Sequence, residues 1–205
     1  MRYEIPKDPK KIRQRIRSYE RKLEKELQEF GRYTDGYGKR FFIGPLYLLI
    51  DDLEGALKHF QSFECEFGAE EGEPAQVLCW ALALYRYGAE RGARSLLKLT
   101  MQKNLYIIPY LIGEEIVELD IRHGSSDEWP MILNWIPDKY FDMWTDEELA
   151  WATAVYRSPE FVEERNRLIE ENSSSPHEPK GPEELAEVRE IFGLEKQPSR
   201  RRRVR

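Results

Sequence analysis

The sequence predicts an all-α protein built from helix–turn–helix units, with a capping helix at the N-terminus and an atypical acidic helical unit toward the C-terminus. Three observations favour this fold. Apolar residues recur with helical spacing near the N-terminus, residues 45–97 contain a weak internal repeat, and no segment shows a convincing strand-like alternation. We expect one helical domain over residues 1–171.

The N-terminal segment predicts one long amphipathic helix. Asp8 is a suitable N-cap, Pro9 suits the first helical position, and Gly31 is a natural C-terminal stop. The apolar residues of this segment recur at intervals of three or four and form one stripe: Ile12, Ile16, Tyr19, Leu23, Leu27 and Phe30. We expect the stripe to pack on the core of the same chain, and the alternative is a short coiled coil with a second copy.

The next stretch, YTDGYGKR at residues 33–40, has the composition of a glycine-rich loop. A phosphate-binding loop needs a Ser or Thr after its Gly-Lys pair, and a dinucleotide-binding loop needs a third Gly where Phe41 stands. Neither requirement is met, so we expect a turn between helices in which at least one glycine has a positive φ. The turn is also a candidate anion site, in which Arg40 pairs with a carboxylate and Lys39 stays accessible. Its candidate residues are Asp35, Gly36, Gly38, Lys39 and Arg40.

Residues 45–97 repeat weakly when the sequence is shifted by 37 positions. The pair Gly55-Ala56 then falls on Gly92-Ala93, and Phe60 falls on Leu97. Each copy predicts an apolar helix, a short turn and a second helix that begins near the Gly-Ala pair. Small residues at these places let two antiparallel helices approach closely, so we expect the alanine of each pair to be buried.

Two stretches of this region carry a family resemblance. DDLEGALKHFQSF resembles the second helix of a tetratricopeptide repeat, and WALALYRYGAERGARSLL resembles a whole repeat unit. The following NLYIIPYLIGEE resembles a segment that closes repeat arrays in small uncharacterised bacterial proteins. The resemblance covers about residues 42–112 and implies an α-solenoid with a concave face that holds a peptide or partner helix. The candidate partner-binding residues are Tyr85, Arg86, Asn104, Tyr106 and Tyr110.

Residues 127–171 are acidic and rich in aromatic side chains. Thr145 and Glu148 have the spacing of a capping box, and Ser158 precedes Pro159 as the expected cap of a last helix. Four of the five tryptophans fall in this region, and we expect most of them in the core and one or two in a groove. We interpret this part as the end unit that a repeat array requires.

Charge is strongly segregated along the chain. Residues 1–40 carry 13 Lys and Arg against 7 Asp and Glu, whereas residues 41–171 carry 11 against 25. Beyond them we expect a linker over 172–181, a short helix over 182–193 and a disordered basic tail over 194–205. The arginines of the tail are Arg200, Arg201, Arg202, Arg203 and Arg205.

Catalytic and metal-binding patterns are missing from the sequence. The three histidines are far apart, and Cys65 and Cys79 lack the spacing of a zinc site. We therefore expect no enzyme activity, metal or cofactor, reduced thiols, no membrane span and a cytoplasmic location. The expected function is protein–protein interaction. The alternative is a nucleic-acid- or ribosome-associated accessory protein that uses the basic first helix and tail. A third interpretation is an enzyme that uses the loop at residues 35–40.

Overall fold

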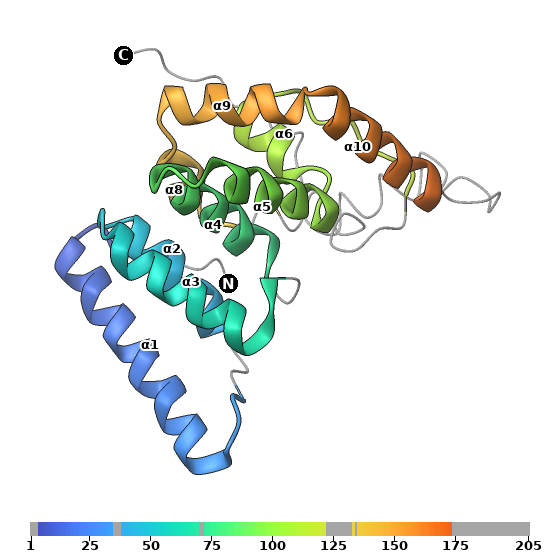
Figure 1. Ribbon diagram of the computed structural model, residues 1–205. Helices are drawn as coiled ribbons and strands as arrows, with labels where there is room; N and C mark the ends of the chain where they lie inside the picture. Colours follow the sequence, from blue (N-terminus) through green and yellow to red (C-terminus); the bar gives the residue numbers. More distant parts are fainter. Residues whose placement is uncertain (1–3, 35–37, 70–71, 122–132, 134, 174–205) are drawn as a thin grey trace, which may run out of the picture.

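Helices account for the regular structure of the described part of the chain, as predicted (Figure 1). The computed structural model describes residues 4–34, 38–69, 72–121, 133 and 135–173. Their only β-type pairing is an isolated bridge between Ile121 and Ser173. The helices are α1 (Pro9–Phe30), α2 (Lys39–Leu48), α3 (Leu53–Phe67), α4 (Pro74–Arg86), α5 (Glu90–Lys103), α6 (Ile107–Ile112), α8 (Asp138–Asp142), α9 (Asp146–Tyr156) and α10 (Pro159–Asn172).

The helices stack from one end of the molecule to the other. Figure 1 shows α1, α2 and α3 at one end, α4 and α5 in the middle, and α6, α9 and α10 at the other end. Helix α2 packs against α1, α3 and α4, helix α5 packs against α4, α6 and α10, and α9 packs against α6 and α10. The buried apolar side chains form one continuous core along this stack.

Local signals set both ends of α1 as the sequence predicts. The Asp8 carboxylate accepts a hydrogen bond of 2.8 Å from the backbone N–H of Lys10. Gly31 adopts a left-handed conformation with a φ of 65°, and its N–H donates to the carbonyl of Leu27. A left-handed residue at this position closes the last turn, which explains why the helix ends at a glycine.

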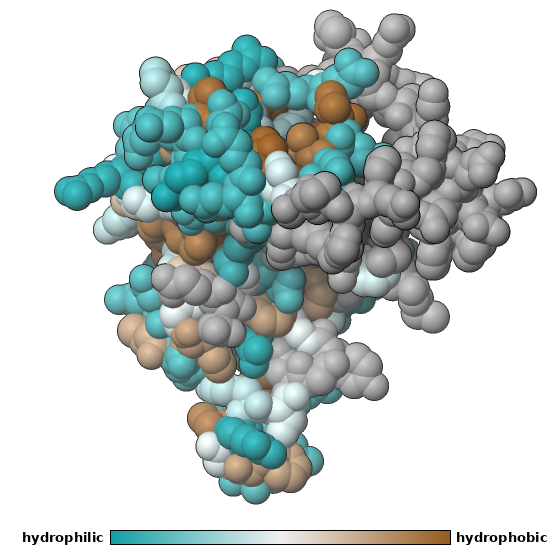
Figure 2. All heavy atoms as spheres, turned by 90° about the vertical axis from the view of Figure 1, so that its right-hand side faces the viewer, coloured by the Kyte–Doolittle hydropathy of each residue, from teal (hydrophilic) through white to brown (hydrophobic). Residues whose placement is uncertain are grey.

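The apolar stripe of α1 is buried only over part of its length. Ile12, Ile16 and Leu23 are buried against the body, whereas Leu27 and Phe30 are 41% and 60% exposed. The reason is length, because α1 has 22 residues and its partner α2 has ten, so α1 extends roughly 18 Å further. The end of α1 therefore reaches beyond the other helices in Figure 1, and Figure 2 shows apolar surface at this lower tip.

Helix α2 begins earlier than the repeat pattern indicates. It starts at Lys39 and continues through Pro45, which lies inside the helix. Gly38 is its N-cap and has a left-handed φ of 60°. This confirms that at least one glycine of the predicted turn has a positive φ, and it places Lys39 and Arg40 in the first helical turn rather than in the loop.

The two turns that are 37 residues apart have the same backbone form. Asp51 has a φ of 57° and Gly88 has a φ of 85°. The next residue in each turn donates its N–H to a carbonyl five positions earlier, from Asp52 to Tyr47 and from Ala89 to Leu84. Helix pairs α2–α3 and α4–α5 are therefore joined by equivalent turns.

The small residues of each pair lie at equivalent close contacts. A Cβ atom at Gly55 would lie 2.6 Å from the Tyr47 ring, and one at Gly92 would lie 2.9 Å from a methyl carbon of Leu84. The neighbouring Ala56 and Ala93 are fully buried, which confirms their predicted burial. Side chains larger than methyl do not fit between the paired helices at these places.

Replacing Ala56 or Ala93 with Leu is expected to lower the free energy of unfolding by about 1–3 kcal/mol, because the added carbons must displace packed neighbours. Chemical denaturation of each variant measures this loss. The matched control is Ala150→Leu, at an exposed position of α9, for which a change within about 0.5 kcal/mol is expected. Unchanged stability in both buried variants would contradict the close helix contact.

The C-terminal unit is attached to α5 by polar contacts. Arg94 donates to Glu160 at 2.9 Å, and Gln102 donates to Glu164 at 2.8 Å. The predicted capping box is present at the start of α9. Ser158 precedes α10 as predicted, but its side chain does not cap that helix and its Oγ lies 3.1 Å from the Arg94 guanidinium instead.

Several predicted features lie outside the described residues. These are Asp35, Gly36 and Trp129, the linker from residue 174 on, the short helix at 182–193, and the tail with Arg200, Arg201, Arg202, Arg203 and Arg205. None of the helices in the described ranges is long and apolar enough to cross a membrane.

Candidate functional site

Two of the predicted partner-binding residues are used inside the fold. Asn104 is 1% exposed, and its Oδ1 accepts hydrogen bonds from the backbone N–H groups of Tyr106 and Ile107 at 2.9 and 3.0 Å. Tyr106 is also buried, and its hydroxyl accepts a hydrogen bond from the N–H of Leu119. These side chains fix the connection from α5 to α6 and are not available to a partner at the surface.

Arg86 is the main polar link between α4 and the C-terminal unit. Its Nε and one of its terminal nitrogens donate to the two oxygens of Glu148, at 2.7 and 3.1 Å. The same terminal nitrogen donates to the carbonyl of Met143 at 2.8 Å. A guanidinium that is held by two acceptor groups has a fixed orientation. Arg86 therefore positions α9 on α4.

Glu148 is held in its charged form by this arrangement. Burial by itself would raise the pKa of Glu148, but the hydrogen bonds from Arg86 and from the Thr145 N–H lower the pKa below its ordinary value. The Thr145 N–H lies 2.7 Å from the carboxylate as part of the capping box. One side chain thus begins α9 and connects α9 to α4.

Tyr85 and Trp151 form an aromatic pair beside this link. Their ring centroids are 4.4 Å apart and their planes are tilted by 31°. Both side chains are partly exposed, and the Trp151 indole N–H donates to a Glu90 carboxylate oxygen at 3.3 Å. The pair and its hydrogen bond join α9 to the neighbouring helices α4 and α5, and the bond from Trp151 to Glu90 spans 61 positions of the sequence.

Carboxylates surround the aromatic pair. Burial raises the pKa of the Tyr85 hydroxyl, and the exposed carboxylates of Glu147 and Glu90, with Glu148, raise this pKa further. Since Arg86 is bonded to Glu148, the two exposed carboxylates give this place a negative local field. We call Tyr85, Glu90, Glu147 and Trp151 the aromatic–acidic surface.

The remaining predicted partner residue, Tyr110, belongs to α6. It is partly buried, and its ring contacts Phe141 edge-on with centroids 4.9 Å apart. Trp151 was not singled out by the sequence, since its exposure depends on how α9 packs on α4. Trp144 is buried as expected for the core, and Trp135 is 59% exposed.

The candidate anion site is only partly described, and its cations have internal contacts. Lys39 lies 3.4 Å from Glu26, and its side chain is only 12% exposed. The expectation that Lys39 stays accessible is therefore wrong, because the end of α1 places a carboxylate beside it. The Arg40 guanidinium lies over the rings of Phe41 and Phe67, 4.8 and 4.7 Å from their centroids. These contacts connect the start of α2 to α3.

His59 supports the same region as a partly buried side chain. Its Nε2 donates to the backbone carbonyl of Arg40 at 2.9 Å, which joins α3 to the first turn of α2. Burial lowers the pKa of His59, against smaller opposing effects of the Arg40 carbonyl, Glu20 and Glu66. His59 therefore has a structural role in the described part of the chain.

The free energy of unfolding is expected to fall as the pH is lowered from about 7.5 to about 5.5. In this range the unfolded chain protonates His59 near its ordinary pKa, whereas the folded protein takes up that proton only at lower pH. Urea denaturation at several pH values measures this slope. His59→Gln keeps an N–H donor and should flatten the slope. The carboxylates of Glu148 and Glu164 titrate below this range, since their pKa values are lowered. An unchanged slope in His59→Gln would assign the effect to other groups.

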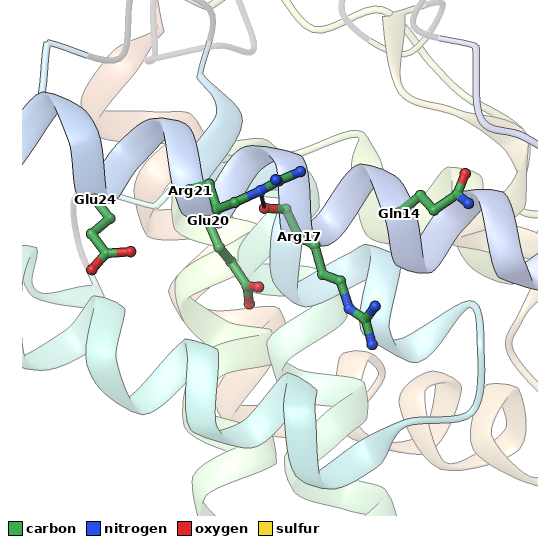
Figure 3. A pocket seen from close by; sticks show the side chains of 5 residues that line it. All are labelled: Gln14, Arg17, Glu20, Arg21 and Glu24. Atoms are coloured by element: carbon green, nitrogen blue, oxygen red, sulfur yellow. Dashed lines mark hydrogen bonds between the residues drawn. The ribbon is translucent and has the colours of Figure 1, made fainter.

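A polar groove runs along the side of α1 (Figure 3). It has a volume of about 490 Å³ and is lined by Gln14, Arg17, Glu20, Arg21 and Glu24. Figure 3 shows the Arg17 side chain reaching outward from α1 and Arg21 lying back along the helix, where its Nε donates to the Arg17 carbonyl. The lining side chains are all polar and exposed.

Metal and thiol chemistry find little support in the described ranges. No group of three or more His, Cys, Asp or Glu side chains there is arranged to hold a metal ion. Cys65 is exposed, Cys79 is buried, and they are not joined in a disulfide. Burial raises the pKa of the Cys79 thiol, so it packs as a small apolar group.

Comparisons of the chain with protein families, curated protein sequences and solved structures give no match.

Proposed function

We propose that this protein is an interaction module that holds a Lys- or Arg-containing segment of a protein partner on the aromatic–acidic surface. The observation that carries the proposal is the partly exposed Tyr85–Trp151 pair with two exposed carboxylates next to it. An aromatic face attracts a cation, and a nearby carboxylate adds an ion pair and a hydrogen-bond acceptor. A single cationic side chain of the partner can make both contacts.

The rigidity of the site supports the same proposal. Arg86 and Glu148 hold α4 and α9 together directly beside the aromatic pair. A partner therefore meets side chains that are already ordered, and binding costs less conformational entropy than it would on a mobile loop. The equivalent turns of α2–α3 and α4–α5 agree with a tetratricopeptide-like stack, and such folds offer extended faces for peptides.

The test is binding of an immobilised random peptide library by the full chain. Peptides that contain Lys or Arg should be enriched over peptides that contain Gln in the same places. In the variant Glu90→Gln/Glu147→Gln the affinity for a selected peptide should fall by about 2- to 30-fold, since two exposed ion pairs worth about 0.2–1 kcal/mol each are lost. Gln at position 90 keeps an acceptor for the Trp151 N–H, so the aromatic pair stays in place.

The matched control removes two carboxylates at exposed positions of another helix, in the variant Glu163→Gln/Glu170→Gln on α10. This variant has the same change in net charge and should bind the selected peptide as the unchanged chain does. Equal loss in both variants would mean that general charge, and not the aromatic–acidic surface, attracts the peptide. No enrichment of cationic peptides would refute the proposal.

A further inference from the structure

The outer face of α1 carries a row of exposed cations. Five of them form no ion pair with any described residue, and we call these five the basic ridge: Lys10, Lys11, Arg17, Arg21 and Lys22. At 100° per residue they spread over about 140° of the helix surface, with Arg21 and Lys10 roughly opposite to the buried Ile12, Ile16 and Leu23 and Lys22 at one flank. From Lys10 to Lys22 the ridge is about 18 Å long.

The acids of α1 do not neutralise the ridge. Glu20 accepts a hydrogen bond of 2.7 Å from the Tyr47 hydroxyl of α2. Glu26 is turned toward Thr34 and Lys39, at 3.0 and 3.4 Å. Glu20 and Glu26 are thus held by neighbouring groups, while Glu20 and Glu24 also line the polar groove beside Arg17 and Arg21 (Figure 3).

Helix stability does not account for this placement of charge. The first turn of α1 contains no acidic residue, and residues 9–19 contain five cations and no acid. Positive side chains near a helix N-terminus oppose the helix dipole, so such a distribution is unfavourable for the helix by itself. Arg13 lies 3.8 Å from Asp52, and Arg15 donates to the carbonyl of Glu4. These two contact residues outside α1, whereas the ridge forms no ion pair with any described residue and one hydrogen bond within α1, from the Arg21 Nε to the Arg17 carbonyl.

We propose that the basic ridge binds the phosphate backbone of duplex nucleic acid. Cations at intervals along an exposed helix suit a line of phosphates, and the major groove of a duplex is wide enough for a helix. Helix α1 lies at the edge of the molecule with its outer face open (Figure 1). In Figure 3 the Arg17 side chain extends from α1 into the polar groove.

The composition of this face favours binding of a nucleic-acid duplex over binding of a single strand or of a protein partner. No exposed aromatic side chain lies between Lys10 and Lys22, so the stacking that holds single strands is missing. No exposed apolar side chain lies there either, whereas a protein interface is usually centred on such anchors. The ridge offers only charge and hydrogen-bond donors, which are the groups that contact phosphates.

Binding to the ridge should depend steeply on salt. Five phosphate contacts predict that log K falls with log [salt] with a slope of about −4.5, which is a loss of about 500-fold between about 50 and about 200 mM salt. The experiment measures fluorescence anisotropy of a short labelled duplex, once as DNA and once as RNA. The full chain is used with its five tail arginines replaced by Gln, so that the tail does not contribute: Arg200, Arg201, Arg202, Arg203 and Arg205.

The ridge variant adds Lys10→Gln, Arg17→Gln and Arg21→Gln to this chain. Loss of three contacts should reduce the slope to about −1.8 and weaken binding at low salt by at least tenfold. The proposal is supported if either duplex shows this reduced slope and weaker binding in the ridge variant. DNA and RNA are equivalent here because they share the phosphate backbone. A melting curve of each variant checks that the fold is retained.

The control variant instead replaces three exposed cations on other helices, Lys58→Gln, Arg91→Gln and Arg167→Gln. It has the same net charge as the ridge variant and should keep the steep slope. The proposal is overturned if the chain binds neither duplex, or if both variants lose affinity equally. It is also overturned if a labelled oligo-glutamate peptide binds more tightly than both duplexes, since the ridge would then serve an acidic protein segment.

Discussion

Replacing Arg86 with Met is expected to lower the free energy of unfolding by about 3–5 kcal/mol, because the Glu148 carboxylate is then left buried without its cation. The Glu148 side chain is only 9% exposed, so water cannot replace the lost guanidinium. The Met143 carbonyl loses a donor at the same time. Chemical denaturation of the purified variant measures the change.

A double-mutant cycle with Glu148→Leu distinguishes a buried pair from simple loss of packing. If the uncompensated charge causes the loss, Arg86→Met/Glu148→Leu should be more stable than Arg86→Met alone, since no buried charge is left. A loss of about 1 kcal/mol should persist in the double variant, because the carboxylate of the capping box is also gone. Additive losses in the cycle would contradict the pairing.

Replacing Phe60 with Ala is expected to cost about 3–5 kcal/mol, because a fully buried ring at the meeting point of three helices is removed. The ring belongs to α3 and stacks on Trp80 of α4, with centroids 5.3 Å apart and planes within 6°. One edge of the ring lies against Gly44 of α2, where a Cβ atom would be 2.3 Å from the ring. Thermal and urea denaturation measure the loss. The control Phe30→Ala removes the same side chain at an exposed position and should change stability by less than about 1 kcal/mol.

Gly44 gives a second measurement of the same contact. Gly44→Ala alone should destabilise the protein by about 1–3 kcal/mol, because the new methyl group overlaps the Phe60 ring. In the Phe60→Ala background the methyl group has room, so the same change should be close to neutral or stabilising, since Ala favours helix over Gly. An equal cost of Gly44→Ala in both backgrounds would show that the ring is not what excludes a side chain at this position.

The two proposed surfaces have opposite charge and lie on different parts of the stack. The basic ridge is on α1 at one end, and the aromatic–acidic surface joins α4, α5 and α9. Because charge separates in the fold as it does in the sequence, a cationic protein segment and a polyanion can bind without competing for the same side chains. Variants of one surface should leave binding at the other unchanged.

Several elements follow from the sequence because their causes are local. Asp8 and Gly31 end α1 through contacts within a few residues, and Thr145 and Glu148 form the capping box across three. The 37-residue offset correctly relates the turns at Asp51 and Gly88, since a turn depends on its own few residues. The repeat pattern begins at residue 45 and so misses the first turn of α2, which starts at Lys39 after the left-handed Gly38.

The sequence by itself determined the helical class, both ends of α1, the starts of α9 and α10, the burial of Ala56 and Ala93 and the separation of charge. These features depend on neighbours one to four residues apart or on a regular period. Only the tertiary structure decided which side chains meet across helices. Arg86 pairs with Glu148 from 62 positions away, and Phe60 excludes a side chain at Gly44 from another helix. Such contacts depend on how helices cross, and many crossings are compatible with the same apolar stripes. For that reason Arg86, which the sequence predicts as a partner-binding residue, is a structural link between helices. The Tyr85–Trp151 pair beside it forms only when the chain folds.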